Sequence, residues 1–185
     1  MQNLGKIPVK VIVTKDHEGR DQVETMIDLE HFFDLSINSL DDLKEFKESY
    51  LNLIRNAKEI LDEIRKKRQI GNSSLYWKLG LLLDDFLNNS AKFNFTNYRK
   101  AFEREIGLTD TLIGILLDFP KVFEKKEVDD RIPFSYYLEL TQKARKLERK
   151  NQLTKAKEEL HRVVIPTDHP DTMQFRKNLK RMLNE

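Results

Sequence analysis

The chain of 185 residues has no cysteine, only 6 glycines and 5 prolines, and no long apolar run. Without cysteine it has no disulfides, no thiolate metal site and no cysteine nucleophile, which agrees with the cytoplasmic location that we predict. The few glycines and prolines leave room for long helices. We expect no membrane partner, since no segment approaches ~18–20 apolar residues, and no signal peptide, since the first residues lack an apolar core.

Charge is abundant but unevenly distributed. Charged residues make up 35% of the chain and hydrophobic residues 39%, which is typical of helices with long solvated faces. Residues 1–64 hold 8 Lys and Arg against 14 Asp and Glu, whereas residues 65–185 hold 25 against 17. An acidic front and a basic back predict that the back half meets a polyanion.

The apolar pattern predicts a mainly α-helical fold with an amino-terminal β-hairpin. Alternating residues at 7–13 and 22–29 indicate the hairpin, and we define four segments. These are 1–38 (hairpin and connector), 39–70 (long helix), 71–150 (helical domain) and 151–185 (carboxy-terminal helical extension). Helices are predicted at about 39–69, 73–89, 95–106, 109–119, 134–150, 152–163 and 171–183. Ser39 is the predicted cap of the first, Ser73 or Ser74 caps the second, and Pro120 marks the end of the fourth. The segment 152–163 either continues the helix before it or follows a break near Asn151.

The long helix carries a heptad seam. Its spacing of 3 and 4 is typical of a coiled coil, which predicts a homodimer or higher homo-oligomer. Additional apolar positions at Leu51, Ile54 and Leu61 widen the stripe, so packing within its own domain is an equal alternative. The seam residues are Leu43, Phe46, Tyr50, Leu53, Ala57, Ile60 and Ile64.

Residues 92–119 have the spacing of a helix-turn-helix, which makes DNA the first partner to consider. Gly107 falls at the turn, where a residue without Cβ can adopt positive φ. Glu103 stands where the motif has a small residue. The apolar positions of the motif are filled by Phe102, Ile106, Leu108, Ile113 and Leu116.

The side chains around this motif favour contacts to phosphate over base reading. The first turn of the second helix offers threonines and Asp110, without Arg, Lys, Asn or Gln for bidentate base contacts. The candidate nucleic-acid contacts are Lys92, Arg99, Lys100, Arg104, Thr109, Thr111 and Lys121. An equally simple explanation is two core helices with a solvated basic face.

A second basic run lies further along the chain. In a helix its members four residues apart form rows that could follow a phosphate backbone, although a solvated face explains them as well. The run comprises Lys143, Arg145, Lys146, Arg149, Lys150, Lys155, Lys157 and Arg162.

Enzyme chemistry has little support in the sequence. The four histidines lack metal-ligand spacing, and there is no phosphate-binding P-loop and no dinucleotide fingerprint. The predicted hairpin loop holds Asp16, His17, Glu18 and Asp21, where a solvated polar turn explains them better than a metal site. We therefore predict no enzyme activity, no cofactor and no metal, and a metal-dependent hydrolase is the weakest hypothesis.

Three segments resemble the amino-terminal, winged-helix-like domain of the YhcG-like PDDEXK nuclease family. They are Leu75-Tyr76-Trp77-Lys78-Leu79-Gly80, then residues 108–112 leading to Asp118-Phe119, and finally residues 132–138. The order and spacing are similar over about a third of the chain, although Thr111 replaces the family's usual Asn. The resemblance implies a DNA-binding module. Nuclease activity is not implied, since the family's nuclease domain follows this region and has no counterpart here.

Together these patterns predict a DNA-binding protein, regulatory or an accessory subunit, that contacts the phosphate backbone through a helix-turn-helix and basic helices. The alternative is a protein-interaction or scaffold module that oligomerises through the 40–69 helix, with Leu112, Ile115 and Leu117 buried. The sequence indicates neither the DNA site nor the pathway.

Overall fold

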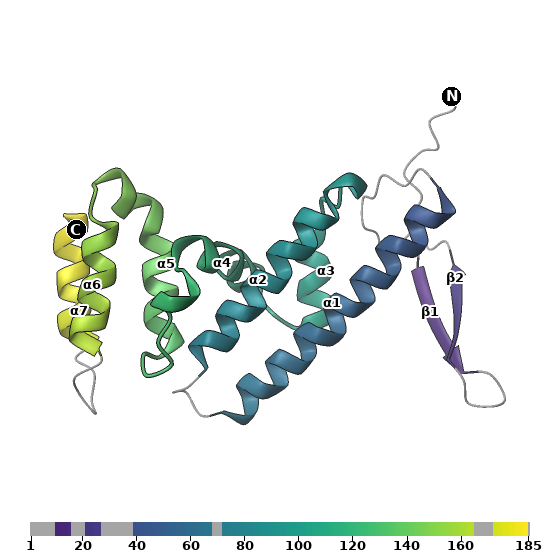
Figure 1. Ribbon diagram of the computed structural model, residues 1–185, viewed down its shortest axis with the longest axis horizontal. Coiled ribbons are helices and arrows are strands. Elements are labelled where there is room, and N and C mark those ends of the chain that lie inside the picture. Colours follow the sequence, from purple (N-terminus) through teal and green to yellow (C-terminus); the bar gives the residue numbers. More distant parts are fainter. Residues whose placement is uncertain (1–9, 16–20, 27–38, 68–71, 165–171, 185) are drawn as a thin grey trace. The chain divides into compact units, whose positions relative to one another are not determined.

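The mainly helical fold class is confirmed. The structure, a computed structural model, describes residues 10–15, 21–26, 39–67, 72–164 and 172–184 (Figure 1). This part of the chain contains α1 (Leu40–Lys66), α2 (Ser73–Asn89), α3 (Tyr98–Ile106), α4 (Asp110–Val122), α5 (Phe134–Arg149), α6 (Leu153–Val164) and α7 (Thr172–Leu183). Two single-turn 3₁₀ helices, η1 (Ala91–Phe93) and η2 (Lys125–Glu127), lie between them.

Two short strands precede the helices. Strands β1 (Lys10–Lys15) and β2 (Asp21–Met26) pair antiparallel, with the register running from Lys10 opposite Met26 to Lys15 opposite Asp21. The strand segments predicted at 7–13 and 22–29 extend in part outside the described residues, as does the turn between them.

Helix α1 begins at the predicted serine cap and packs its seam within the chain. Ser39 Oγ accepts the Asp42 N–H at 3.1 Å, satisfying one of the free donors at the helix start. The described side chains of the seam are buried. Of the three residues that widen the stripe, Ile54 and Leu61 are also buried, whereas Leu51 is 43% exposed. This broad buried stripe is typical of a helix packed in its own chain, so the seam is not free to form a coiled coil. The buried residues are Phe46, Tyr50, Leu53, Ile54, Ala57, Ile60, Leu61 and Ile64.

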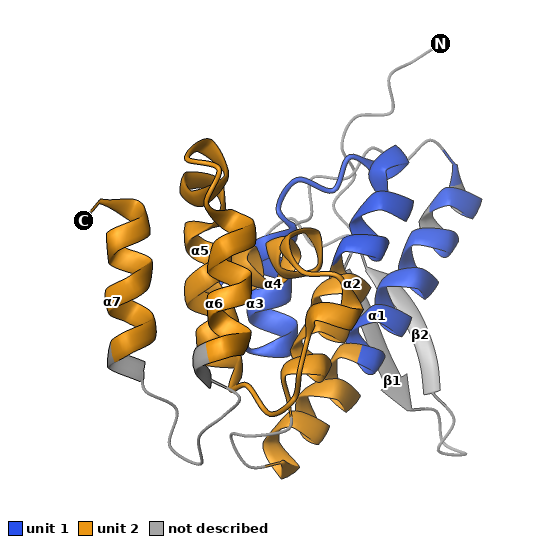
Figure 2. Ribbon diagram, turned by 60° about the vertical axis from the view of Figure 1, so that its left-hand side comes forward, with its two compact units in different colours: residues 1–56, 84–110 blue, residues 57–83, 111–185 orange. Residues whose placement is uncertain are grey.

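The chain forms two compact units, each built from two separate stretches (Figure 2). Unit 1 comprises residues 1–56 and 84–110, and unit 2 comprises residues 57–83 and 111–185. The core of unit 1 is aromatic, because Phe46 lies 5.3–5.9 Å, centroid to centroid, from the rings of four neighbours. Those neighbours are Tyr50, Phe86, Phe93 and Phe95.

In unit 2 two of the segments that carry the family resemblance, residues 75–80 and 132–138, contact each other through aromatic rings. Tyr76 stacks on Phe134 with centroids 3.9 Å apart, and Phe134 in turn contacts Phe119 at 5.4 Å. Trp77 Nε1 donates to the Phe123 carbonyl at 2.8 Å. The tryptophan and its neighbouring aromatic residues therefore have a structural role that accounts for their spacing.

Helices α2 and α4 approach unusually closely at Gly80. A Cβ at this position would lie 2.1 Å from Leu116 O and 3.1 Å from Pro120 Cδ. The prediction that Pro120 ends the helix is wrong, because α4 continues to Val122 with Pro120 inside it. Since proline has no N–H, it cannot donate to the carbonyl four residues earlier, which is that of Leu116. The Cα–H of Gly80 points at this carbonyl and supplies a weak donor in its place.

The start of α2 is capped from a distant part of unit 2. Asp130 accepts both the Ser74 N–H and the Ser74 hydroxyl at 2.7 Å, and the Ser73 hydroxyl donates to the Ile132 carbonyl at 2.6 Å. The predicted serine cap is therefore wrong. The serines act as donors, and a carboxylate 56 residues away from Ser74 accepts the helical N–H.

Helices α5, α6 and α7 pack on one another in unit 2. Asn151 has a φ of 54°, so the break near this residue is confirmed and α6 starts at Leu153. A left-handed residue ends a helix because it cannot continue the right-handed path. The proline-containing segment 165–171 before α7 lies outside the described residues.

Gly80→Ala should destabilise the protein. Replacing glycine by alanine in a helix normally stabilises by roughly 0.5–1 kcal/mol. Overpacking costs about 1–3 kcal/mol, and here the obstacle is a backbone carbonyl that cannot rotate away, so the clash should dominate. Denaturant unfolding measures the difference. Lys78→Ala on the exposed side of the same helix is the control, and equal stability of the two variants would contradict the close approach.

Candidate nucleic-acid interface

The predicted motif has the expected order of a helix, a glycine turn and a second helix. Gly107 ends α3 with a φ of 70°, and its N–H donates to the Glu103 carbonyl at 3.0 Å. Four of the motif's apolar residues are buried, and Leu108 is half-buried. Residues up to Asp110 belong to unit 1 and those from Thr111 to unit 2, so the packing of a helix-turn-helix stays a prediction.

Glu103 does not occupy an interior position. Its side chain is exposed, next to the buried Phe102 on α3. Glu103 is therefore accommodated at the motif's small position because its side chain points outward. Its carboxylate adds negative charge to the surface that also carries Arg99 and Lys100.

Three of the candidate bases in unit 1 are already paired with carboxylates. Lys92 contacts Glu45 at 2.6 Å, Arg99 contacts Asp110 at 3.5 Å and Arg104 contacts Glu105 at 3.1 Å. Each of these bases is about half exposed, and such surface pairs contribute roughly 0–1 kcal/mol. A phosphate could therefore replace the carboxylate at small cost. Lys100 is exposed and has no ion-pair partner in the described part of the chain.

The first turn of α4 and the residue before it present polar side chains, as do Asp118 and Lys121 further along the helix. Thr109, Asp110 and Thr111 are exposed, and Leu112 is half-buried. Ile115 and Leu117 are buried, as the scaffold hypothesis expects. The middle of α4 is therefore not available to contact a DNA groove. Thr111 and the exposed Lys121 belong to unit 2, whereas Lys92, Arg99, Lys100, Arg104 and Thr109 belong to unit 1.

The second basic run combines members in close ion pairs with members that are mainly exposed. Lys143 contacts Glu139 at 3.3 Å, Lys157 contacts Glu127 at 3.0 Å, and Arg162 pairs with Glu159. Arg145, which is 85% exposed, lies 4.0 Å from Asp118. Lys146, Arg149, Lys150 and Lys155 are also exposed.

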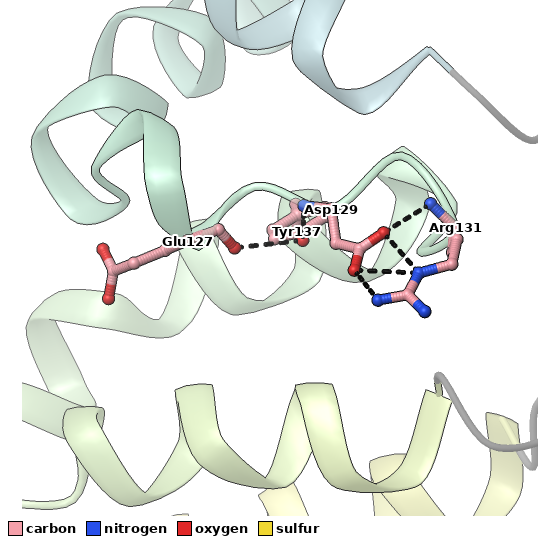
Figure 3. Close-up of polar contacts among 4 residues, drawn as sticks. All are labelled: Glu127, Asp129, Arg131 and Tyr137. Carbon is pink, nitrogen blue, oxygen red and sulfur yellow. Dashed lines mark hydrogen bonds and ion pairs between the residues drawn. The ribbon is translucent and has the colours of Figure 1, made fainter.

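A cluster of polar contacts surrounds the connection between α4 and α5 (Figure 3). The Tyr137 hydroxyl accepts the Asp129 N–H at 2.8 Å and donates to the Glu127 carbonyl at 3.2 Å. Arg131 donates to both Asp129 oxygens, at 2.5–3.0 Å. Glu127 accepts the Glu124 N–H at 2.7 Å and both of its oxygens accept from Lys157 at 3.0 Å, which ties the connection to α6.

The pKa shifts in this cluster follow from these bonds. Burial raises the pKa of Tyr137 to about 12, which keeps its hydroxyl protonated at neutral pH. The Arg131 side chain lowers the pKa of Asp129. Burial pushes the pKa of Glu127 upward, but the bonds from Glu124 and Lys157 outweigh burial and lower it. Each polar group has a partner inside the cluster, so its role is structural.

No local pattern in the sequence indicates this cluster, since its members lie on η2, the following loop, α5 and α6. No group of three or more His, Asp or Glu residues that could hold a metal ion occurs within the described ranges. Of the hairpin-loop candidates, Asp16, His17 and Glu18 lie outside these ranges, and Asp21 is the first residue of β2. Among the described helices, none combines the length and apolar character needed to cross a bilayer.

Comparison of the chain with models of protein families, with curated proteins and with solved structures finds no match. The resemblance to the YhcG-like domain therefore stays a prediction. What the structure adds is that Tyr76 and Trp77 make contacts within unit 2 and that Gly80 lies against the Leu116 carbonyl.

Glu127→Gln should weaken the acid sensitivity of folding. Because its pKa is lowered in the folded state, Glu127 contributes stability above its ordinary value of 4.5 and loses it as pH falls through the folded value. The variant should unfold more readily at pH 7, by about 1 kcal/mol, since a charge-assisted hydrogen bond is weakened. It should lose less stability than the wild type between pH 5 and 3. Thermal unfolding across pH tests this, with the exposed Glu148→Gln as the charge-matched control. An equal loss of stability between pH 5 and 3 for the wild type and Glu127→Gln would contradict this prediction.

Proposed function

We propose that this protein binds DNA through phosphate-led contacts from α3 and the first turn of α4. The observation that carries this proposal is the Arg99–Asp110 ion pair, which holds a guanidinium of α3 beside the exposed start of α4 at 3.5 Å. Arg99 and Lys100 follow one another on the helix, and Lys100 and Arg104 lie one turn apart. Exposed Thr109 and Thr111 flank Asp110.

The residue types favour contacts to the DNA backbone over sequence reading. Arginine and lysine side chains bind phosphate oxygens, and threonine hydroxyls donate to them. The exposed first turn of α4 has no side chain for bidentate contact to guanine or adenine. The proposed mode therefore has strong salt dependence and modest sequence preference. A regulatory or accessory role fits a module without its own chemistry.

A scaffold function is the second candidate, and the burial of Ile115 and Leu117 favours it. The seam of α1, through which such a scaffold was expected to oligomerise, is buried within one chain. Elution from heparin against salt, with light scattering for mass, separates the two candidates. Late elution of a monomer supports DNA binding, whereas early elution of a stable oligomer supports a scaffold.

Arg99→Glu combined with Lys100→Glu should weaken DNA binding. For each phosphate that is no longer neutralised, the slope of log affinity against log salt should become shallower by about 0.9. Fluorescence anisotropy with a labelled duplex at several salt concentrations measures both quantities. Lys58→Glu with Lys66→Glu, both exposed on α1, makes the same charge change. Equal weakening by the two double variants would show that net charge, and not α3, determines binding.

Asp110→Asn should strengthen DNA binding several-fold. The substitution removes a charge that repels phosphate and releases Arg99 from its ion pair, which contributes at most about 1 kcal/mol. Loss of an acidic residue from the first turn of α4 lowers helix stability slightly, by about 0.3–1 kcal/mol. A thermal melt checks folding, and Asp118→Asn on the same helix is the matched control. Unchanged or weaker binding would argue against α3 as the contact surface.

A further inference from the structure

Helix α7 is basic on one side and apolar on the other. Phe175, Leu179 and Leu183 are 1–3% exposed, so the apolar side is fully docked in unit 2. The outward side carries Arg176, Lys177, Lys180 and Arg181, all exposed. No Asp or Glu occurs between Thr172 and Leu183, so nothing on the helix itself offsets these charges.

Three of the four bases of α7 lack a carboxylate partner in the described part of the chain. Arg176 contacts Glu139 of α5 at 3.0 Å. In the described part of the chain, no ion pair involves Lys177, Lys180 or Arg181, whereas three of the α3-side candidates are paired. An approaching anion therefore meets full positive charge on α7 without displacing an internal partner first.

Helix α5 brings further bases to the same end of the bundle. Tyr136 packs on Phe175 with centroids 5.6 Å apart, and Lys150 Nζ donates to the Leu183 carbonyl. The starts and the ends of α5 and α7 therefore coincide, and the two helices run parallel, with α6 antiparallel to both (Figure 1). Exposed Arg149 and Lys150 at the end of α5 consequently lie near the end of α7.

Helix dipoles explain only part of this arrangement. Lys180 and Arg181 lie in the last turn of α7, where positive charge is favoured by the dipole. Arg176 and Lys177 lie in its first half, where the dipole gives no such preference. A membrane surface is a poor partner, because interfacial helices insert an exposed apolar face and the apolar face of α7 is buried.

We propose that the outer face of α7, together with the end of α5, is a second DNA-backbone contact surface. Lys177 and Arg181 lie one helical turn apart, with roughly 5–6 Å between such positions, so both can reach one phosphate strand. The inference rests on the proposed DNA binding, but its residues belong to unit 2, whereas the bases of α3 belong to unit 1. The two surfaces can therefore be removed separately.

The test compares two triple variants of the full chain by anisotropy with a labelled DNA duplex. One is Lys177→Glu, Lys180→Glu and Arg181→Glu. The matched control is Lys58→Glu, Lys66→Glu and Lys67→Glu, which changes the net charge by the same amount. These residues are exposed on α1 or directly after it, and, as in α7, they include the end of a helix. The α7 variant should lower the salt slope by about one for each phosphate that α7 no longer binds, up to about three, and the control should lower it less. Should the α7 variant melt early, glutamine at the same three positions keeps the fold and removes the charge.

Comparison with the α3 double variant separates the two proposals. Weaker binding by the α7 variant but not by the α3 variant supports this surface and overturns α3 as the DNA contact. Weaker binding by the α3 variant alone overturns this surface and leaves the proposed function standing. Equal effects of the α7 and control variants, or binding of the wild type to phosphatidylserine vesicles but not to duplex DNA, would also overturn it.

Discussion

The core of unit 2 depends on the contact between Gly80 and the Leu116 carbonyl. Pro120 deprives this carbonyl of its helical donor, and Gly80 is the residue whose missing side chain lets α2 approach and cover it. The same two helices make further contacts in unit 2 through Tyr76 and Trp77 of α2 and Phe119 of α4. The missing Cβ of Gly80 lets α2 cover the Leu116 carbonyl, and the missing N–H of Pro120 leaves that carbonyl free to be covered. The two residues therefore compensate for each other.

The helices were predictable because their signals are local. The apolar spacing, Ser39 and the break at Asn151 act within a few residues, and the corresponding features of the structure lie at the predicted positions. The cap of α2 and the extent of α4 were predicted wrongly, because both are decided by residues far along the chain. Asp130 reaches Ser74 across 56 residues, and Gly80 compensates for Pro120.

The candidate site was predictable in its residue types but not in its charge. Sequence shows that Lys92, Arg99 and Arg104 are basic, whereas their carboxylate partners come from α1, the start of α4 and α3 itself. Pairing reduces the field that a phosphate meets, so a count of bases overstates the attraction of α3. The same reasoning favours α7, whose composition already contains no acid and whose docked apolar face turns the bases outward. Electrostatic arguments from sequence are therefore most secure where a helix carries charge of one sign.

The interleaving of the two units has a consequence for synthesis on the ribosome. Helix α2 leaves the exit tunnel well before Asp130, Ile132 and Leu116, the residues that cap and cover it. Until these follow, the Ser74 N–H has no carboxylate acceptor and Gly80 has no α4 carbonyl to cover. Residues 84–110, which complete unit 1, are made in this interval. The order of translation thus completes the aromatic unit 1 before the second stretch of unit 2, residues 111–185, is made.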